Sequence, residues 1–173
     1  CLPGTITAVP GLTVCSECPV GRYVPVSGSH ECDKCEPGKY QDAKEGVQCK
    51  ICKAGYFSAG GVVEECTICP EGKFAPSDGA YKCLDCPLGK YTDIEGTTQC
   101  TDCAPGKHMP TLGATQCTKC KAGMYQSSYG HDSCMECPVG KTTNVDGRAQ
   151  CRDCTPGKYA YATGQSKCDL CAL

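Results

Sequence analysis

The most reactive residue type in this chain is cysteine, which occurs 21 times in 173 residues. Twenty of these cysteines form ten C-x-x-C pairs, from Cys15 and Cys18 to Cys168 and Cys171, and Cys1 stands alone. Such pairs support three kinds of chemistry: thiolate ligation of zinc, dithiol–disulfide redox catalysis, and structural disulfide bonding. The spacing of the pairs along the chain helps to distinguish these three kinds of chemistry.

The cysteine pairs recur with a period of 17 residues and no exception. The first cysteines run from Cys15 to Cys168 and the second from Cys18 to Cys171, and Cys1 lies 17 residues before Cys18. The chain therefore reads as ten repeats that start at residues 1, 18, 35, 52, 69, 86, 103, 120, 137 and 154, with a partial eleventh repeat at 171–173. No linker or change of composition interrupts them, so we expect a single tandem array over residues 1–173.

Zinc binding is the main rival to disulfide bonding. Zinc sites group cysteines in fours, and an unbroken ladder with an odd cysteine does not divide in that way. Redox catalysis is disfavoured because no βαβ pattern surrounds any copy. The histidines His30, His108 and His131 occupy different places in their repeats and have no constant acidic companion. The sequence therefore predicts no catalytic residues, no cofactor and no metal, and a protein that is not an enzyme.

Two turns and a short strand are expected in each repeat. Counting from the cysteine that opens the repeat, position 4 is Gly in all ten repeats, position 11 is Gly in eight, and Pro stands at position 2 or 3 in eight. Such glycines and prolines mark turns. Position 6 is aromatic in seven repeats, and we expect this column to pack over the next disulfide. No segment has helical periodicity.

Large apolar side chains are too few for an ordinary core. Leu, Ile, Val and Phe together number 23 of 173 residues, and there is no Trp. Covalent cross-links must therefore offset much of the ordering entropy. The fold class expected is a small disulfide-rich repeat array: an elongated rod or solenoid of ten 17-residue two-turn loops, with short β-strands, no helix and a minimal hydrophobic core.

The cysteines can pair in two registers. In the favoured one, each repeat closes its own ring, which encloses both turns and lets the ends meet at the distance that a disulfide needs. Its pairs are Cys1–Cys15, Cys18–Cys32, Cys35–Cys49, Cys52–Cys66, Cys69–Cys83, Cys86–Cys100, Cys103–Cys117, Cys120–Cys134, Cys137–Cys151 and Cys154–Cys168. The alternative joins the two cysteines within each C-x-x-C pair. The first register leaves Cys171 unpaired within the chain, and we expect its partner beyond Leu173 in a longer array or, as the alternative, in another chain.

Several repeats resemble a known module. Cys-Pro-Val-Gly-Arg-Tyr (18–23), Cys-Pro-Glu-Gly-Lys-Phe (69–74) and Cys-Pro-Leu-Gly-Lys-Tyr (86–91), each followed by Gly and then C-x-x-C, resemble ephrin-receptor-like (GCC2/GCC3) repeats. They are also similar to the first half-module of tumour-necrosis-factor-receptor cysteine-rich domains. That resemblance implies a disulfide across the same 14-residue gap. The receptor domains alternate this half-module with a second type, which is missing here, so the resemblance implies the fold more strongly than cytokine-receptor function.

The expected function is structural. The net charge of −2 with interspersed signs gives no nucleic-acid footprint, and no apolar run is long enough to span a membrane. We expect an extracellular or cell-surface, secreted, disulfide-laddered filament or stalk, a segment of a longer surface or fibril protein that self-associates or binds other surface or matrix proteins. Covalent O-linked glycans are a further expectation. The alternative is a receptor-like ectodomain spacer or ligand-binding module, with a contact patch of Tyr56, Phe57, Val62 and Val63 in the atypical fourth repeat.

Overall fold

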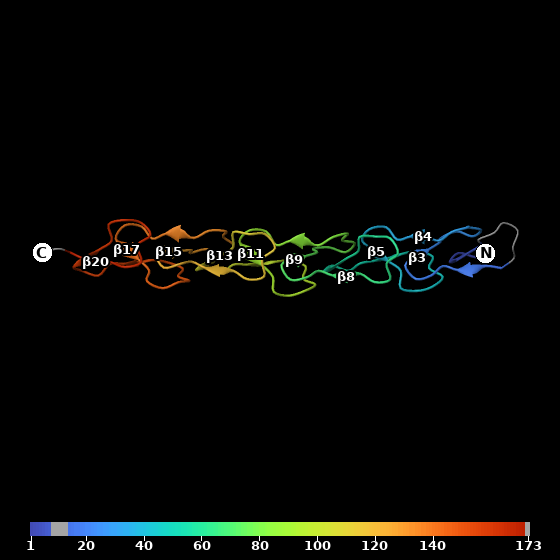
Figure 1. Ribbon diagram of the computed structural model, residues 1–173, viewed down its shortest axis with the longest axis horizontal. Helices are drawn as coiled ribbons and strands as arrows, with labels where there is room; N and C mark the ends of the chain where they lie inside the picture. Colours follow the sequence, from blue (N-terminus) through green and yellow to red (C-terminus); the bar gives the residue numbers. More distant parts are fainter. Residues whose placement is uncertain (8–13, 172–173) are drawn as a thin grey trace. The chain divides into compact units, whose positions relative to one another are not determined.

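The computed structural model describes residues 1–7 and 14–171. Gly11, one of the position-11 glycines, lies outside this range, as do Ala172 and Leu173 of the partial eleventh repeat. The described residues form short strands and turns without any helix, as the repeat pattern predicts (Figure 1). None of them belongs to a helix that could cross a bilayer.

Every repeat contributes two strands of two residues each. The strands are β1 (Thr5–Ile6), β2 (Ser16–Glu17), β3 (Arg22–Tyr23), β4 (Asp33–Lys34), β5 (Lys39–Tyr40), β6 (Lys50–Ile51), β7 (Tyr56–Phe57), β8 (Thr67–Ile68), β9 (Lys73–Phe74), β10 (Leu84–Asp85), β11 (Lys90–Tyr91), β12 (Thr101–Asp102), β13 (Lys107–His108), β14 (Thr118–Lys119), β15 (Met124–Tyr125), β16 (Met135–Glu136), β17 (Lys141–Thr142), β18 (Arg152–Asp153), β19 (Lys158–Tyr159) and β20 (Asp169–Leu170). The two strands of a repeat pair with each other in a two-stranded antiparallel sheet. Sheets this small depend on the turns and disulfides around them.

The turn before the first strand explains the glycine at position 4. In the second repeat, the amide of Arg22 donates to the carbonyl of Pro19 at 3.2 Å, and Gly21 between them has a φ of 78°. A positive φ at the third residue of such a turn favours glycine. The turn directs β3 so that position 5 lies opposite position 17 and position 6 opposite position 16.

The chain divides into two compact units, Cys1–Leu84 with Ile94–Gln99, and Asp85–Asp93 with Cys100–Leu173. Within each unit, the backbone of one repeat bonds to the next. The amide of Cys18 donates to the carbonyl of Gly4 at 2.9 Å in the first unit, and the amide of Cys120 donates to that of Gly106 at 2.9 Å in the second. The ladder of hydrogen bonds therefore continues from repeat to repeat.

Each unit also brings together repeats that are two apart. A Cβ atom added at Gly38 would overlap the carbonyl oxygen of Gly79, and one added at Gly123 would overlap that of Gly164. The glycine at position 4 is thus required twice, by its positive φ and by the backbone that lies against it. A repeat therefore contacts the two repeats that follow it, not only its immediate neighbour.

Apart from the glycines at position 4, most buried residues form two columns. One holds the opening cysteines, such as Cys52 and Cys120, whose side chains have 0% exposure. The other is position 7, which directly follows the aromatic column and is buried in nine repeats: Val24, Gln41, Ser58, Ala75, Thr92, Met109, Gln126, Thr143 and Ala160. The core is minimal, as expected from the composition, and much of it is sulfur and polar side chains.

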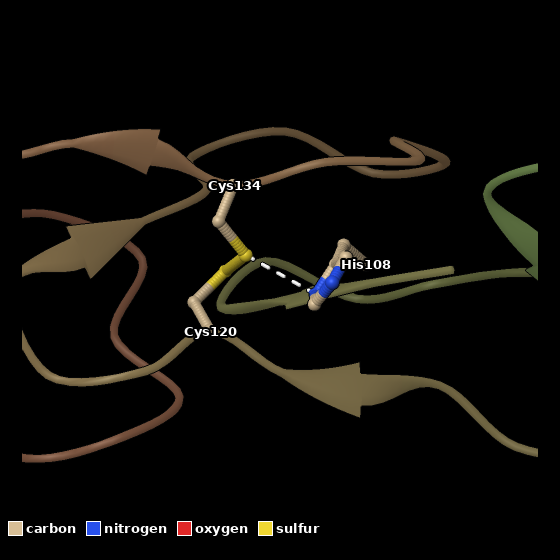
Figure 2. A group of neighbouring side chains, drawn as sticks. All are labelled: His108, Cys120 and Cys134. Carbon is tan, nitrogen blue, oxygen red and sulfur yellow. Dashed lines mark hydrogen bonds between the residues drawn. A yellow bond between two sulfur atoms is a disulfide. The ribbon is translucent and has the colours of Figure 1, made fainter. Parts of the chain in front are cut away.

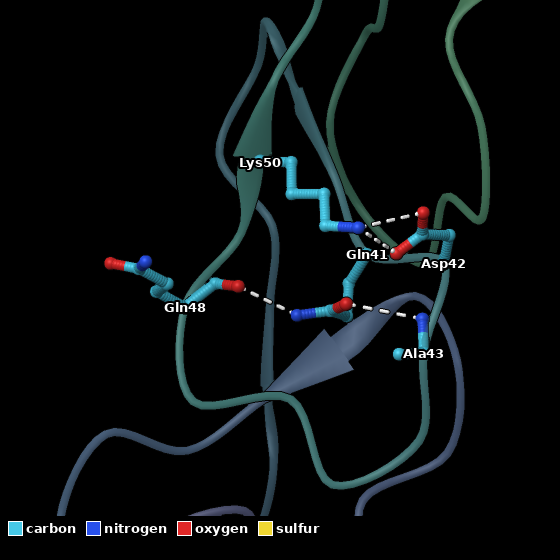
Figure 3. Close-up of polar contacts among 5 residues, drawn as sticks. All are labelled: Gln41, Asp42, Ala43, Gln48 and Lys50. Atoms are coloured by element: carbon cyan, nitrogen blue, oxygen red, sulfur yellow. Dashed lines mark hydrogen bonds and ion pairs between the residues drawn. The ribbon is translucent and has the colours of Figure 1, made fainter.

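Buried polar side chains at position 7 have hydrogen-bond partners inside their own loop. The Gln41 side chain donates from Nε2 to the Gln48 carbonyl at 2.6 Å and accepts from the Ala43 amide at 3.1 Å (Figure 3). Gln126 makes the same two bonds five repeats later, to Ser133 and Ser128. Each glutamine ties the second turn of its loop to the first strand and so replaces the apolar contacts that the loop lacks.

Candidate functional site

Ten disulfides cross-link the chain, and each closes one repeat. They join cysteines 14 residues apart: Cys1–Cys15, Cys18–Cys32, Cys35–Cys49, Cys52–Cys66, Cys69–Cys83, Cys86–Cys100, Cys103–Cys117, Cys120–Cys134, Cys137–Cys151 and Cys154–Cys168. Cys171 is free and exposed. Its amide donates to the carbonyl of Gly157 at 3.0 Å, as the amide of Cys154 does to the carbonyl of Gly140 one repeat earlier.

A groove recurs where position 6 of one repeat faces the disulfide of the next. At two repeats, a polar side chain at position 6 reaches this disulfide directly. His108 Nδ1 lies 3.2 Å from Cys134 Sγ, and Thr142 Oγ1 lies 3.3 Å from Cys168 Sγ. These contacts place the histidine and the threonine at position 6 beside the next disulfide, where the sequence predicts that the aromatic side chains of the other repeats pack.

The groove over the next disulfide differs in volume between repeats. The groove has a volume of about 250 Å³ beside Tyr40, about 450 Å³ beside His108 and about 420 Å³ beside Thr142. All three grooves are lined by the same repeat positions, which are 6 and 17 of one repeat and 2, 5, 14 and 15 of the next. A further hollow of about 530 Å³ adjoins Tyr40 on its other side and is lined by Asp42, Glu64 and Glu65, so a tyrosine at position 6 divides the space beside it rather than abolishing it.

His108, Cys120 and Cys134 are the residues whose atoms could best hold a metal ion. One potential ligand atom from each lies within 4.8 Å of the others (Figure 2). Cys120 and Cys134 are joined in a disulfide, however, and zinc binds thiolates. With the disulfide formed, the cluster offers a metal ion the imidazole of His108 but no thiolate. The three residues therefore form a contact between a histidine and a disulfide.

Charged side chains pair within a repeat as well as between repeats. Lys90 Nζ lies 2.8 Å from Asp102 Oδ1, and Lys141 Nζ lies 2.9 Å from Asp153 Oδ1. Position 5 and position 17 face each other across the hairpin, so the basic column pairs with the acidic residue of its own repeat. The pairing is not uniform, because Lys107 faces Lys119 and Lys158 faces Leu170.

The residues expected to form a contact patch lie in two places. Tyr56, which is 39% exposed, lines the groove beside Tyr40 together with Ile51. Val62 and Val63 instead approach Gly21, two repeats earlier, where a Cβ atom would lie 2.7 Å from Val62 Cγ1 and 2.9 Å from the Val63 amide nitrogen. The backbone carbonyl of Val63 also accepts a hydrogen bond from the backbone amide of Gln41 at 2.9 Å.

Phe57 stands at position 6 of this repeat and is half-buried. Strand pairing sets it opposite Thr67 and sets Tyr56 opposite Ile68. The structure therefore places Tyr56 in a groove, whereas the side chain of Val62 and the backbone of Val63 pack against another repeat. The groove beside Tyr40 does not include either valine.

Sequence reasoning missed the buried column at position 7. Its residues are a mixture of Val, Gln, Ser, Ala, Thr and Met, which has no hydrophobic signature. One signal was available: position 7 carries no charged residue, no glycine and no proline in any of the ten repeats. In a chain with 36 charged residues, such an unbroken absence indicates a position that is shielded from water.

Comparison with known families agrees with the cysteine pattern. The model of the family described as tyrosine-protein kinase ephrin type A/B receptor-like matches residues 4–46, 55–103 and 106–148, which together span most of the chain. No curated protein matches the chain. The many disulfides and this family both point to an extracellular protein. With three matched segments and ten regular disulfides, the chain belongs to the ephrin-receptor-like family of tandem cysteine-rich repeats.

Proposed function

We propose that the protein is a non-catalytic extracellular spacer, a disulfide-laddered filament or stalk within a larger surface or fibril protein. The observation that carries this proposal is the contact between repeats two apart. In each unit, glycines at position 4 lie against the backbone of the second repeat that follows, as Gly38 does in the first unit and Gly123 in the second. Within a unit, such contacts restrict bending between the repeats that they join, which suits a spacer module.

The proposal treats the ten repeats as one array because the 17-residue cysteine spacing is unbroken. Repeat arrays are stabilised by contacts between nearby repeats, and binding surfaces form along their length. Lateral association with copies of itself or with other matrix proteins belongs to the same proposal. The exposed thiol of Cys171 is one place where a covalent link to another segment would form.

Small-angle X-ray scattering on the chain with its disulfides intact tests the spacer proposal. A compact globule of this length would have a radius of gyration of about 16 Å. We expect a clearly larger value and a pair-distance distribution with a long tail, and the same curve after heating and cooling. A radius near the globular value would contradict the proposal.

A receptor-like ligand-binding module is the second candidate. It is favoured by the family and by the grooves of about 450 and 420 Å³ beside His108 and Thr142. A spacer needs no open groove, whereas a binding module needs a few repeats that depart from the common pattern. Binding experiments directed at these grooves separate the two candidates.

A further inference from the structure

The groove beside Thr142 differs from the rest of the chain in charge. It lies between the ninth and tenth repeats, over the Cys154–Cys168 disulfide, and is lined by four cationic side chains: Arg148, Arg152, Lys158 and Lys167. Its acidic lining residue is Asp153. The whole chain carries a net charge of −2, so this concentration of positive charge is local. We propose that this groove binds a sulfated or carboxylated saccharide.

One cation of this groove, Lys158, has no acidic residue opposite it on its hairpin. Lys158 faces Leu170 in the position where Lys141 faces Asp153. Asp153 in turn lies 2.9 Å from Lys141 Nζ, so its charge is already matched by a lysine outside the lining. Within residues 1–7 and 14–171, no ion pair joins any of the four lining cations to a carboxylate.

The neutral groups of the groove suit a sugar. Thr155, Ser166, Asn144 and Gln150 line it with hydroxyl and amide groups. These groups can donate to and accept from sugar hydroxyls, and the two guanidinium groups can bind a sulfate or carboxylate with paired hydrogen bonds. None of the lining residues is aromatic, so the groove offers no platform on which nucleic-acid bases could stack.

Thr142 lines this groove with a small side chain where seven of the ten repeats carry a Tyr or Phe. Beside Tyr40 the equivalent space is divided into two hollows of about 250 and 530 Å³, whereas beside Thr142 it is one continuous groove. The equivalent groove beside His108 is open but is lined by Lys119 and Lys121 together with Met124 and Pro110. It therefore serves as an internal comparison with similar volume, fewer cations and a more apolar lining.

The experiment measures binding of a heparin-derived octasaccharide to the whole chain by titration calorimetry at physiological salt. Two variants alter the groove in different ways, one by changing its charge and the other by reducing its volume. Arg148→Gln with Arg152→Gln removes two cations, whereas Thr142→Tyr keeps every charge and fills the groove with the side chain found at this position elsewhere. The matched control is Lys107→Gln with Lys119→Gln, which makes the same charge change at the facing lysines of the seventh repeat. Disulfide content is checked by mass spectrometry for each variant.

We expect both groove variants to weaken binding by about tenfold or more, and the control to change it by less than about threefold. A hyaluronate oligosaccharide, which carries carboxylates without sulfates, distinguishes the two anionic groups. The proposal would be overturned if the wild-type chain bound neither saccharide, if the control lost as much affinity as the groove variants, or if Thr142→Tyr had no effect. Equally tight binding of single-stranded oligothymidine would also overturn it, since that would show general attraction to polyanions.

Discussion

Glu45 occupies a backbone conformation that the other repeats assign to glycine. Its φ is 55°, and it stands at position 11, where eight repeats carry glycine. Its amide donates to the Cys18 carbonyl at 3.0 Å, and its own carbonyl lies where a Cβ atom on Gly4 would be. Contacts with other repeats therefore hold this turn in place, although a glutamate is disfavoured at a positive φ.

Replacing Glu45 with glycine should stabilise the protein. A side chain in the left-handed region costs about 1 kcal/mol, and glycine removes this cost although it makes the unfolded chain more flexible. Thermal unfolding with disulfides intact should show a midpoint higher by about 2–4 °C. Glu45→Ala is the control, because it removes the charge and keeps the strained φ, and it should leave the midpoint nearly unchanged. An equal rise of the unfolding midpoint in both variants would show that loss of the negative charge, not relief of backbone strain, stabilises the protein.

At the scale of the hairpin, side chains on opposite strands and loops hold the repeat in register. In the third repeat, Lys50 on β6 lies 2.7 Å from Asp42 Oδ1, in the loop that follows β5 (Figure 3). The hydrogen bond from Lys50 lowers the pKa of Asp42 and raises the pKa of Lys50. Both side chains are exposed, so the contribution to stability is small.

The direction of the two pKa shifts fixes the pH range over which this pair contributes. The lowered pKa of the Asp42 carboxyl means that its contribution is present at neutral pH and is lost as the pH falls through that pKa. The raised pKa of Lys50 means that its contribution is lost only as the pH rises through that pKa. We expect Lys50→Met to raise the pKa of Asp42 toward 3.8, as measured by NMR titration of the carboxyl. An unchanged titration curve would show that Lys50 is not its partner in solution, and Lys53→Met is the control because Lys53 pairs with Asp78.

At the scale of the whole molecule, stability depends on contacts between repeats rather than on a central core. Most opening cysteines and the residues at position 7 of nine repeats are buried, and the remaining large apolar side chains are mostly exposed or half-buried. The close approach of glycines two repeats apart, such as Gly123 and Gly164, adds a contact that disulfides cannot supply. Each disulfide closes only its own repeat.

Two glycines at position 4 allow a test of how much the contact between repeats two apart contributes to stability. Gly123 and Gly140 have φ values of 85° and 81°, but an added Cβ atom would overlap the Gly164 carbonyl at Gly123 and would meet nothing within 4 Å at Gly140. Gly140→Ala should cost about 1 kcal/mol from backbone strain alone. Gly123→Ala should cost at least about twice as much, because the neighbouring backbone must also move.

The two alanine variants are compared by thermal unfolding midpoints in the intact, oxidised chain. A lower midpoint for Gly123→Ala than for Gly140→Ala is expected, together with faster hydrogen exchange of the Gly164 amide, which donates to the Cys137 carbonyl at 2.9 Å. Equal midpoints would mean that repeats two apart do not press on each other in solution, which would weaken the spacer proposal.

Much of the fold follows from the sequence because its determinants are local. The 17-residue period, the turn at Gly21 and the strand after it depend on residues only a few positions apart, so inspection of one repeat reveals them. The same holds for the lack of helix in residues 1–7 and 14–171 and for the shortage of apolar side chains. The resemblance of Cys-Pro-Val-Gly-Arg-Tyr (18–23) to ephrin-receptor-like repeats likewise needs one repeat and its cysteines.

Other features were decided only by the tertiary structure. The burial of Gln41, the packing of Val62 and Val63 against Gly21, and the open groove at Thr142 all depend on atoms from different repeats or from opposite sides of a loop. A glycine at position 4 indicates a turn in the sequence, but the backbone that also excludes a side chain there comes from about 41 residues further along. The sequence by itself thus determined the repeat and its turns, because these are local. Contacts between repeats decided which positions are buried and which grooves stay open.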